Sequence, residues 1–154
     1  MIGRRAFLLG IALAPVSLRI AEARPAMTVF KDPNCGCCGA WVDHVRANGF
    51  EAEVRIEPAI NRVKARLGVP NDLASCHTAT IDGFVLEGHV PAETIERLLR
   101  ERPAVVGVAV PGMPIGSPGM EAPGQPPEPF KVIGFGPDGR RIVFAEYDRG
   151  YPGW

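Results

Sequence analysis

The sequence lacks any excess of charge and any run of like charge. Its 17 basic and 17 acidic side chains cancel, and they are scattered along the chain. A protein that follows a nucleic-acid backbone needs clustered lysine and arginine to neutralise the phosphates. The even balance therefore argues against nucleic acid as a partner, and it provides no basic tract for an anionic membrane surface.

The sequence also lacks an apolar run long enough to cross a bilayer, for which roughly 20 residues are needed. The apolar stretch from Ala6 to Leu18 is short and is interrupted by Pro15. It follows Arg4-Arg5 and precedes the small-x-small sequence Ala21-Glu22-Ala23, so residues 1–23 are predicted to be an export signal. The paired arginines resemble a twin-arginine signal. We expect a periplasmic mature chain without a stable membrane span.

The rest of the chain alternates between strand-like and helix-like patterns. Apolar residues recur at every second position in the former and at every third or fourth in the latter, and Gly or Pro marks the ends. The predicted elements are a strand at 27–32, a helix at 38–48, a strand at 50–56, a helix at 60–67, a hairpin at 78–82 and 84–88, and a helix from Pro91 to Pro103. This order predicts an α/β fold with a mixed sheet flanked by helices.

The composition changes beyond Pro103. Proline and glycine recur from Pro111 to Pro129 around Met113 and Met120 without apolar periodicity, which predicts a long loop. Two strand-like runs then flank a Gly-Pro-Asp-Gly turn, which predicts a β-hairpin at 130–135 and 141–147, followed by a loosely held tail after Asp148. We expect one domain at 24–103 and an extension at 104–154 that packs on the functional site.

Three of the four cysteines crowd one turn: Cys35, Cys37 and Cys38 precede the first helix, and Cys76 lies further along. Two structural disulfides are a common arrangement in exported proteins. Adjacent cysteines such as Cys37 and Cys38, however, form a disulfide only with a strained backbone. The backbone N–H groups of a helix N-terminus stabilise thiolates, which attack disulfides and bind metals. The cluster favours a redox or soft-metal site.

Four further residues are candidate ligands, namely His77, His89, Met113 and Met120. Thiolate and thioether sulfur together favour Cu(I). Zinc is the alternative metal, but zinc fingers usually supply their ligands as two separated pairs. Each candidate also has a structural interpretation, since His89 can shape the entry to the third helix and methionines often fill gaps in a core. We predict a copper site, and crowded thiolates can bridge more than one ion.

Four neighbouring residues are assigned no part in the chemistry. His44 is predicted to be solvated on the first helix, and Trp41 to anchor the core. Glu87 and Glu121 have no recognisable acid or base partner in the sequence. We therefore expect no hydrolytic activity from these carboxylates.

These residues resemble a known family, the exported, thioredoxin-like copper-resistance proteins called CopG-like. The matching stretches are Cys35-Gly36-Cys37-Cys38-Gly39, Ser75-Cys76-His77-Thr78, Glu87-Gly88-His89-Val90-Pro91 and the run from Pro111 to Glu121. The resemblance implies a thioredoxin-like domain with a C-terminal extension that helps to bind metal. It also implies a cysteine-bridged copper cluster and a role in copper resistance, through Cu(I)/Cu(II) interconversion or handling before efflux.

The resemblance further places Cys35 and Cys38 where a thioredoxin carries its two thiols, while Cys37 departs from that pattern. It places Cys76-His77 where thioredoxins carry a cis-proline. A thiol in place of that proline weakens the interpretation as a dithiol exchanger.

Three functions stay open. The first is a periplasmic copper-binding protein, which would be an enzyme if it turns over as a copper oxidoreductase. The second is a thiol-disulfide oxidoreductase that uses Cys35 and Cys38, and the third is a passive carrier to a copper efflux or chaperone protein. All three need accessible thiolates. We expect a monomer with a multinuclear copper site at Cys35, Cys37, Cys38, Cys76, His77, His89, Met113 and Met120.

Overall fold

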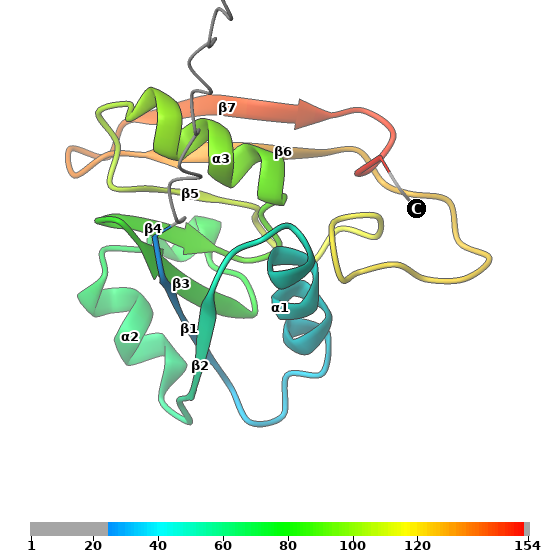
Figure 1. Ribbon diagram of the computed structural model, residues 1–154. Coiled ribbons are helices and arrows are strands. Elements are labelled where there is room, and N and C mark those ends of the chain that lie inside the picture. Colours follow the sequence, from blue (N-terminus) through cyan, green and yellow to red (C-terminus); the bar gives the residue numbers. More distant parts are fainter. Residues whose placement is uncertain (1–24, 153–154) are drawn as a thin grey trace, which may run out of the picture.

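Seven strands of the chain form one sheet in the order β2-β1-β3-β4-β5-β6-β7 (Figure 1). The structure is a computed structural model that describes residues 25–152, so the predicted export signal at 1–23 lies outside the described residues. The elements are β1 (Met27–Lys31), α1 (Cys37–Ala47), β2 (Ala52–Ile56), α2 (Ile60–Arg66), η1 (Asn71–Leu73), β3 (His77–Ile81), β4 (Phe84–Glu87), α3 (Ala92–Glu101), β5 (Gly107–Ala109), β6 (Phe130–Phe135) and β7 (Arg141–Tyr147). Within the described part, no helix is long and apolar enough to cross a membrane.

The first part of the sheet confirms the predicted mixed α/β class. Strand β1 pairs in parallel with β2 across the α1 crossover and antiparallel with β3. Strands β3 and β4 form the predicted hairpin, whose turn residues Asp82 and Gly83 have φ of 47° and 84°. Positive φ at both central positions of a two-residue turn suits the twist of a hairpin. This arrangement is consistent with a thioredoxin-like class.

Strand β5 was not predicted, and it carries the second half of the chain into the same sheet. It pairs in parallel with β4 and antiparallel with β6, and β6 pairs antiparallel with β7. Its three residues lie between Pro103 and Pro111, which is too short a run for apolar alternation to identify a strand. The hairpin β6–β7, which was predicted from its turn, therefore extends one continuous sheet.

The sheet buries side chains on both faces. The larger cluster includes Trp41 and Val45 of α1 and Leu98 of α3, all fully buried. Successive strand side chains point to opposite faces, so Leu86 joins this cluster while Val85 joins a smaller one on the other face. Each fully buried aliphatic side chain of this kind stabilises the fold by about 1.5–3 kcal/mol. The helical spacing of the sequence thus correctly indicated the inward face of α1, including Trp41.

Two expectations were wrong. The apolar alternation of the strand predicted at 50–56 implied one buried face, but Val54 is 36% and Ile56 is 56% exposed. Strand β2 is an edge strand with β1 as its neighbour in the sheet, so its side chains meet few others. The tail after Asp148 was predicted to be loosely held, but the Tyr151 N–H donates to the Gly116 carbonyl at 2.8 Å. Up to residue 152, the tail folds back onto the loop that follows β5.

Candidate metal centre

The cysteine turn connects the end of β1 to the start of α1. The Cys35 N–H donates to the Asp32 carbonyl at 3.1 Å, which closes the turn, and α1 begins at Cys37. The Lys31 Nζ donates to the Cys35 carbonyl at 3.0 Å. Cys38 is fully buried. The turn therefore holds three sulfur atoms at the N-terminal end of a helix, as the sequence indicated.

Cys76 reaches this turn because β1 and β3 are antiparallel. Lys31 at the end of β1 pairs with His77 at the start of β3, so the residue before His77 lies beside the residues that follow Lys31. The Sγ atoms of Cys35, Cys37, Cys38 and Cys76 all lie within 4.8 Å of one another. We call this set the sulfur group. Its members come from two segments that the sheet places side by side.

Two of the four thiols are paired in the structure. Cys35 and Cys38 form a disulfide, with their Cα atoms 5.6 Å apart, whereas Cys37 and Cys76 are free. Cys37 Sγ lies 3.7 Å from Cys35 Sγ. A disulfide sulfur lacks the charge of a thiolate and is a poor metal ligand. The full sulfur group therefore becomes available to a metal only when two electrons reduce the disulfide.

Two histidines flank Cys76 on the side away from the turn. His89 Nδ1 lies 2.7 Å from the Pro118 carbonyl, which can only accept, so Nδ1 carries the proton. Its other nitrogen, Nε2, lies 3.0 Å from Cys76 Sγ, and its lone pair can accept a hydrogen bond from that thiol or bind a metal ion. His77 Nδ1 lies 3.2 Å from the same sulfur. Cys76, His77 and His89 form a second potential donor set, the histidine group, which shares Cys76 with the sulfur group.

Burial keeps the donors of the histidine group uncharged. Burial, assisted by Cys37, raises the pKa of Cys76 to about 12. Burial also lowers the pKa of His77 well below its usual value, and His89, Lys64 and Lys31 lower it further. Burial lowers the pKa of His89, although its hydrogen bond to Pro118 acts in the opposite direction and raises it. A metal ion that binds here must displace the Cys76 proton, whereas the neutral imidazoles can bind without losing one.

The loop from Pro111 to Glu121 lies next to both groups. The Ser75 hydroxyl donates to the Gly112 carbonyl, and the Pro118 carbonyl accepts from His89. A Cβ built on Gly119, which has φ of 83°, would lie 2.6 Å from the Trp41 backbone nitrogen, so the loop backbone packs directly on α1. Met113 follows Gly112 and is 52% exposed, whereas Met120 follows Gly119 and is half-buried. Both predicted thioether donors thus adjoin an anchored glycine.

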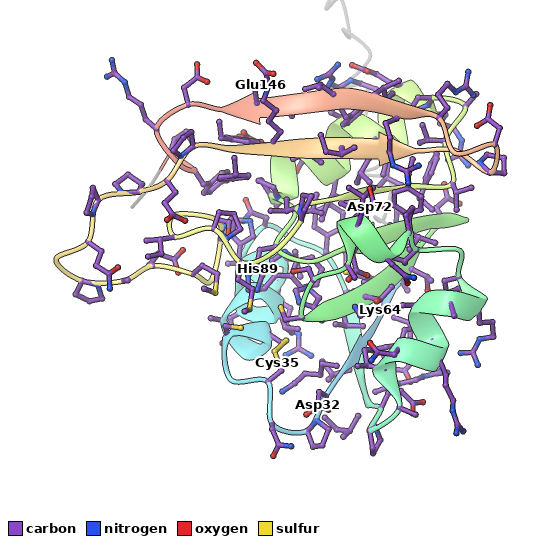
Figure 2. The ribbon with its side chains drawn as sticks, turned by 180° about the vertical axis from the view of Figure 1, so that it is seen from behind. Asp32, Cys35, Lys64, Asp72, His89 and Glu146 are labelled. Atoms are coloured by element: carbon purple, nitrogen blue, oxygen red, sulfur yellow. A yellow bond between two sulfur atoms is a disulfide. The ribbon has the colours of Figure 1, made fainter. Side chains whose placement is uncertain are left out.

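Figure 2 shows Cys35 below His89 on the same side of the sheet region, with Lys64 of α2 beside them. The site therefore draws on α1, on the ends of β3 and β4, and on the loop after β5.

Comparisons with known proteins match part of the site or most of the chain. A family model described as "Protein of unknown function, DUF411" matches residues 73–120, which hold Cys76, both site histidines and residues 111–120 of the loop. Two solved structures named "Copper resistance protein copG", Forms 1 and 2, are each 49% identical with a TM-score of 0.76. The alignments cover 98% of those chains, and they cover 81% of this one for Form 1 and 80% for Form 2. None of the curated proteins compared with the chain matches it.

The chain belongs to the CopG copper-resistance family. Its cysteine cluster and this membership together support a copper-related function. Within this CopG-family protein, the structure places six of the eight predicted site residues in the two donor groups, and it places the methionines on the adjoining loop.

One feature beside the site was missed from the sequence, which had offered no partner for Glu87. Glu87 is fully buried and accepts from Lys64 Nζ at 2.5 Å, from Thr78 Oγ1 at 2.6 Å and from the Ser75 N–H at 2.6 Å. Lys64 comes from the seven-residue helix α2, and nothing in the sequence there indicated its burial. A paired lysine and glutamate 23 residues apart have no local sequence signal.

The prediction for His44 was also wrong. His44 is half-buried, and its Nε2 accepts from the Ala92 N–H at 3.1 Å at the start of α3. Burial lowers its pKa, which suits an unprotonated acceptor. His44 thus joins α1 to α3 rather than facing solvent.

Proposed function

We propose that this CopG-family protein is an exported copper-binding protein that works in the periplasm and handles copper as its cargo. The observation that carries the proposal is the sulfur group, four cysteines whose Sγ atoms lie within 4.8 Å of one another. Thiolates favour Cu(I), and the names of the two similar structures point to copper resistance. The ligands proposed are the four cysteines with His77 and His89, and Met113 and Met120 complete the coordination shell.

The shared position of Cys76 supports binding of more than one ion. One tetrahedral ion uses four ligands, whereas the two donor groups supply six, with Cys76 belonging to both. A thiolate common to two groups can bridge two copper ions. The crowding of Cys37 between Cys35 and Cys38 offers further bridging sulfur. We therefore propose a multinuclear copper centre.

The disulfide suggests how the centre would change the oxidation state of copper. In the reduced protein, the Cys35 and Cys38 thiols would give two electrons to two Cu(II) ions, forming the Cys35–Cys38 bond, two Cu(I) ions and two protons. The structure would then represent the oxidised product, in which Cys37 and Cys76 remain free. An external dithiol would have to reduce the disulfide before the next cycle. The soft Cu(I) product suits the remaining thiols and imidazoles.

We propose the following organisation for the whole chain. Residues 1–23 would direct export and be removed, which leaves a thioredoxin-like domain at 24–103 and an extension at 104–154. The extension would cover the metal, because its loop already contacts Ser75, His89 and Trp41. A copper efflux or chaperone protein would receive the ion from a monomer.

Reduction of the disulfide, anaerobic loading with Cu(I) and elemental analysis together test the copper proposal. We expect more than one copper per chain after desalting, and we expect copper to displace zinc. Retention of zinc in preference to copper, or at most one copper per chain, would contradict the multinuclear centre.

A thiol-disulfide oxidoreductase is the second candidate, and the Cys35–Cys38 disulfide at the start of α1 favours it. Such an enzyme needs two thiols, so Cys37→Ser would leave it active, whereas a copper site would lose a ligand. Insulin reduction and copper titration of Cys37→Ser separate the two. If this variant binds copper as the wild type does and the wild type reduces insulin, the oxidoreductase function would replace the copper proposal.

A further inference from the structure

Ser75 makes contacts in two directions from its place beside Cys76. Its N–H donates to Glu87 Oε1 at 2.6 Å, and its hydroxyl donates to the Gly112 carbonyl of the loop after β5. Its Oγ lies 4.0 Å from Cys76 Sγ. The residue before the shared thiol is therefore bonded to the core on one side and to the loop on the other.

The core side of this path is buried and hydrogen-bonded. Glu87 is completely buried, and the side chain of Lys64, which bonds to it at 2.5 Å, is 7% exposed. Thr78 Oγ1 donates to the second carboxylate oxygen at 2.6 Å and accepts from Lys64 at 3.0 Å. A buried ion pair persists when further hydrogen bonds satisfy its remaining atoms, and here they do. Glu87 thus fixes the position of the Ser75 backbone.

The loop side of the path depends on a close approach at Gly88. This residue has φ of 71°, and a Cβ built on it would lie 2.5 Å from Ser75 Oγ and 2.7 Å from the Val110 carbonyl. Any side chain at position 88 would displace Ser75 from the loop. Glycine there leaves the space in which the Ser75 side chain lies.

We propose that Ser75 is a positioning residue that connects Cys76 to the loop of residues 111–121, so that loop order and copper binding at Cys76 reinforce each other. We call the path from Lys64 through Glu87 and Ser75 to Gly112 the Ser75 link. The inference rests on the proposed copper function. Gly112 precedes Met113, so the link sets where this thioether begins relative to the shared thiol.

The test compares Ser75→Ala with Ser117→Ala in the full mature chain. Both variants remove one serine hydroxyl bonded to a loop carbonyl, since Ser117 Oγ donates to the Pro114 carbonyl at 2.8 Å. The Ser117 bond lies wholly within the loop, whereas the Ser75 bond joins the loop to the thiol. Hydrogen exchange of residues 111–121 is measured with and without Cu(I), and Cu(I) affinity is measured against a competing chelator.

We expect Ser75→Ala to speed exchange of residues 111–116 in the metal-free protein and to remove most of the protection that copper adds there. Loss of one neutral hydrogen bond predicts an affinity for Cu(I) about fivefold lower. Ser117→Ala should loosen its own turn and lower Cu(I) affinity much less than Ser75→Ala does. Because both variants lose one loop hydrogen bond, general destabilisation of the loop predicts equal effects.

Several results would overturn the inference. Exchange of residues 111–121 that matches the wild type in Ser75→Ala would show that the hydroxyl does not hold the loop. Equal losses of Cu(I) affinity in the two variants would show that Ser75 has no special coupling to Cys76. If the wild type binds copper and Ser75→Ala binds it equally well, the positioning role of Ser75 is wrong while the proposed copper function stands. If the wild type binds no copper, the proposed function fails with it.

Discussion

The two sides of the candidate metal centre are built differently. The cysteine turn is a contiguous segment: Cys35, Cys37 and Cys38 lie within four residues at the start of α1. The opposite side draws on the start of β3 for Cys76 and His77, on the end of β4 for His89, and on the loop for Pro118. The turn supplies sulfur and carries a disulfide, whereas the opposite side supplies one thiol and two imidazoles.

The two sides also differ in the contacts that hold their donor atoms in place. The turn is held by short-range bonds, such as the one from the Cys35 N–H to Asp32. The opposite side is held by contacts between distant segments, among them the buried pair of Lys64 and Glu87. We expect changes in the turn to alter copper binding with little effect on stability. Substitutions on the opposite side should alter both copper binding and stability.

The largest effect on copper binding is expected from Cys76→Ser. Cys76 belongs to both donor groups, so its loss removes the only sulfur that the groups share. Cys37→Ser removes a member of the sulfur group alone and leaves the histidine group intact. Elemental analysis after Cu(I) loading should show at most one copper per chain in Cys76→Ser and a smaller loss in Cys37→Ser.

Circular dichroism of both variants provides the control, because neither residue belongs to the hydrophobic clusters and both folds should persist. An equal loss of copper in the two variants would contradict a bridging role for Cys76.

The largest effect on stability is expected from Lys64→Met. The substitution leaves Glu87 buried without its positive partner, and removal of one member of a buried ion pair costs about 3–5 kcal/mol. The double variant Lys64→Met, Glu87→Leu removes both charges and should recover much of that loss. Urea unfolding of the metal-free proteins measures both. A single variant as stable as the wild type would show that the pair contributes little.

The same contrast explains what the sequence could predict. The cysteine turn, the hairpins and helices α1 and α3 follow from local signals, namely periodicity, turn residues and spacing. The meeting of Cys76 with the turn is also foreseeable, because a resemblance to a known family placed them together. Local signals gave the identity of the donor residues at the site, including His77 and His89 as candidates.

What could not be predicted depends on contacts between segments far apart in the chain. The burial of Lys64 follows from pairing with Glu87, and that of His44 from docking of α3 on α1. The exposure of Val54 and Ile56 follows from their place on an edge strand, since alternation alone does not say whether a helix covers the strand. Strand β5 was missed because neighbours on both sides, rather than its own three residues, define it.

A change of pH should affect the opposite side more than the turn. Burial lowers the pKa of His77 and His89, and also of His44 on α1, so the unfolded chain takes up protons near pH 6.5 while the folded chain does not. The free energy of unfolding of the metal-free protein should therefore be fully present above pH 6.5 and decrease as the pH falls below it. Each such histidine adds a slope of at most about 1.4 kcal/mol per pH unit.

Urea midpoints at pH 7.5 and pH 5.5 check this expectation, and His89→Gln serves as the matched variant. Glutamine cannot be protonated in this range, so the decrease between the two values should be smaller in His89→Gln. A midpoint that stays constant or rises towards pH 5.5 in the wild type would contradict the lowered pKa values.

The smallest effect is expected from the methionines of the loop, which lies between the two sides and belongs to neither. Met113 is 52% exposed and Met120 is half-buried, so neither contributes much to the core, and substitution should not unfold the chain. A thioether is neutral and needs no deprotonation, so it can complete the shell of a Cu(I) ion without adding charge to a thiolate-rich centre. The double variant Met113→Leu, Met120→Leu should therefore bind Cu(I) about tenfold more weakly, or by about 1.4 kcal/mol. The cysteines of this variant should still bind copper.

The order of the loop should also depend on copper. Fixing the backbone costs about 1–2 kcal/mol per residue, and glycine and proline give this loop no regular hydrogen bonding to offset that cost. Its fixed points include Gly112 on Ser75, Gly116 on Tyr151 and Pro118 on His89. Contact of copper with Met113 would add another, so copper should slow hydrogen exchange of residues 111–121 in the wild type and much less in the double variant. Equal protection in both proteins, together with unchanged copper affinity, would leave the loop as a cover that supplies no ligand.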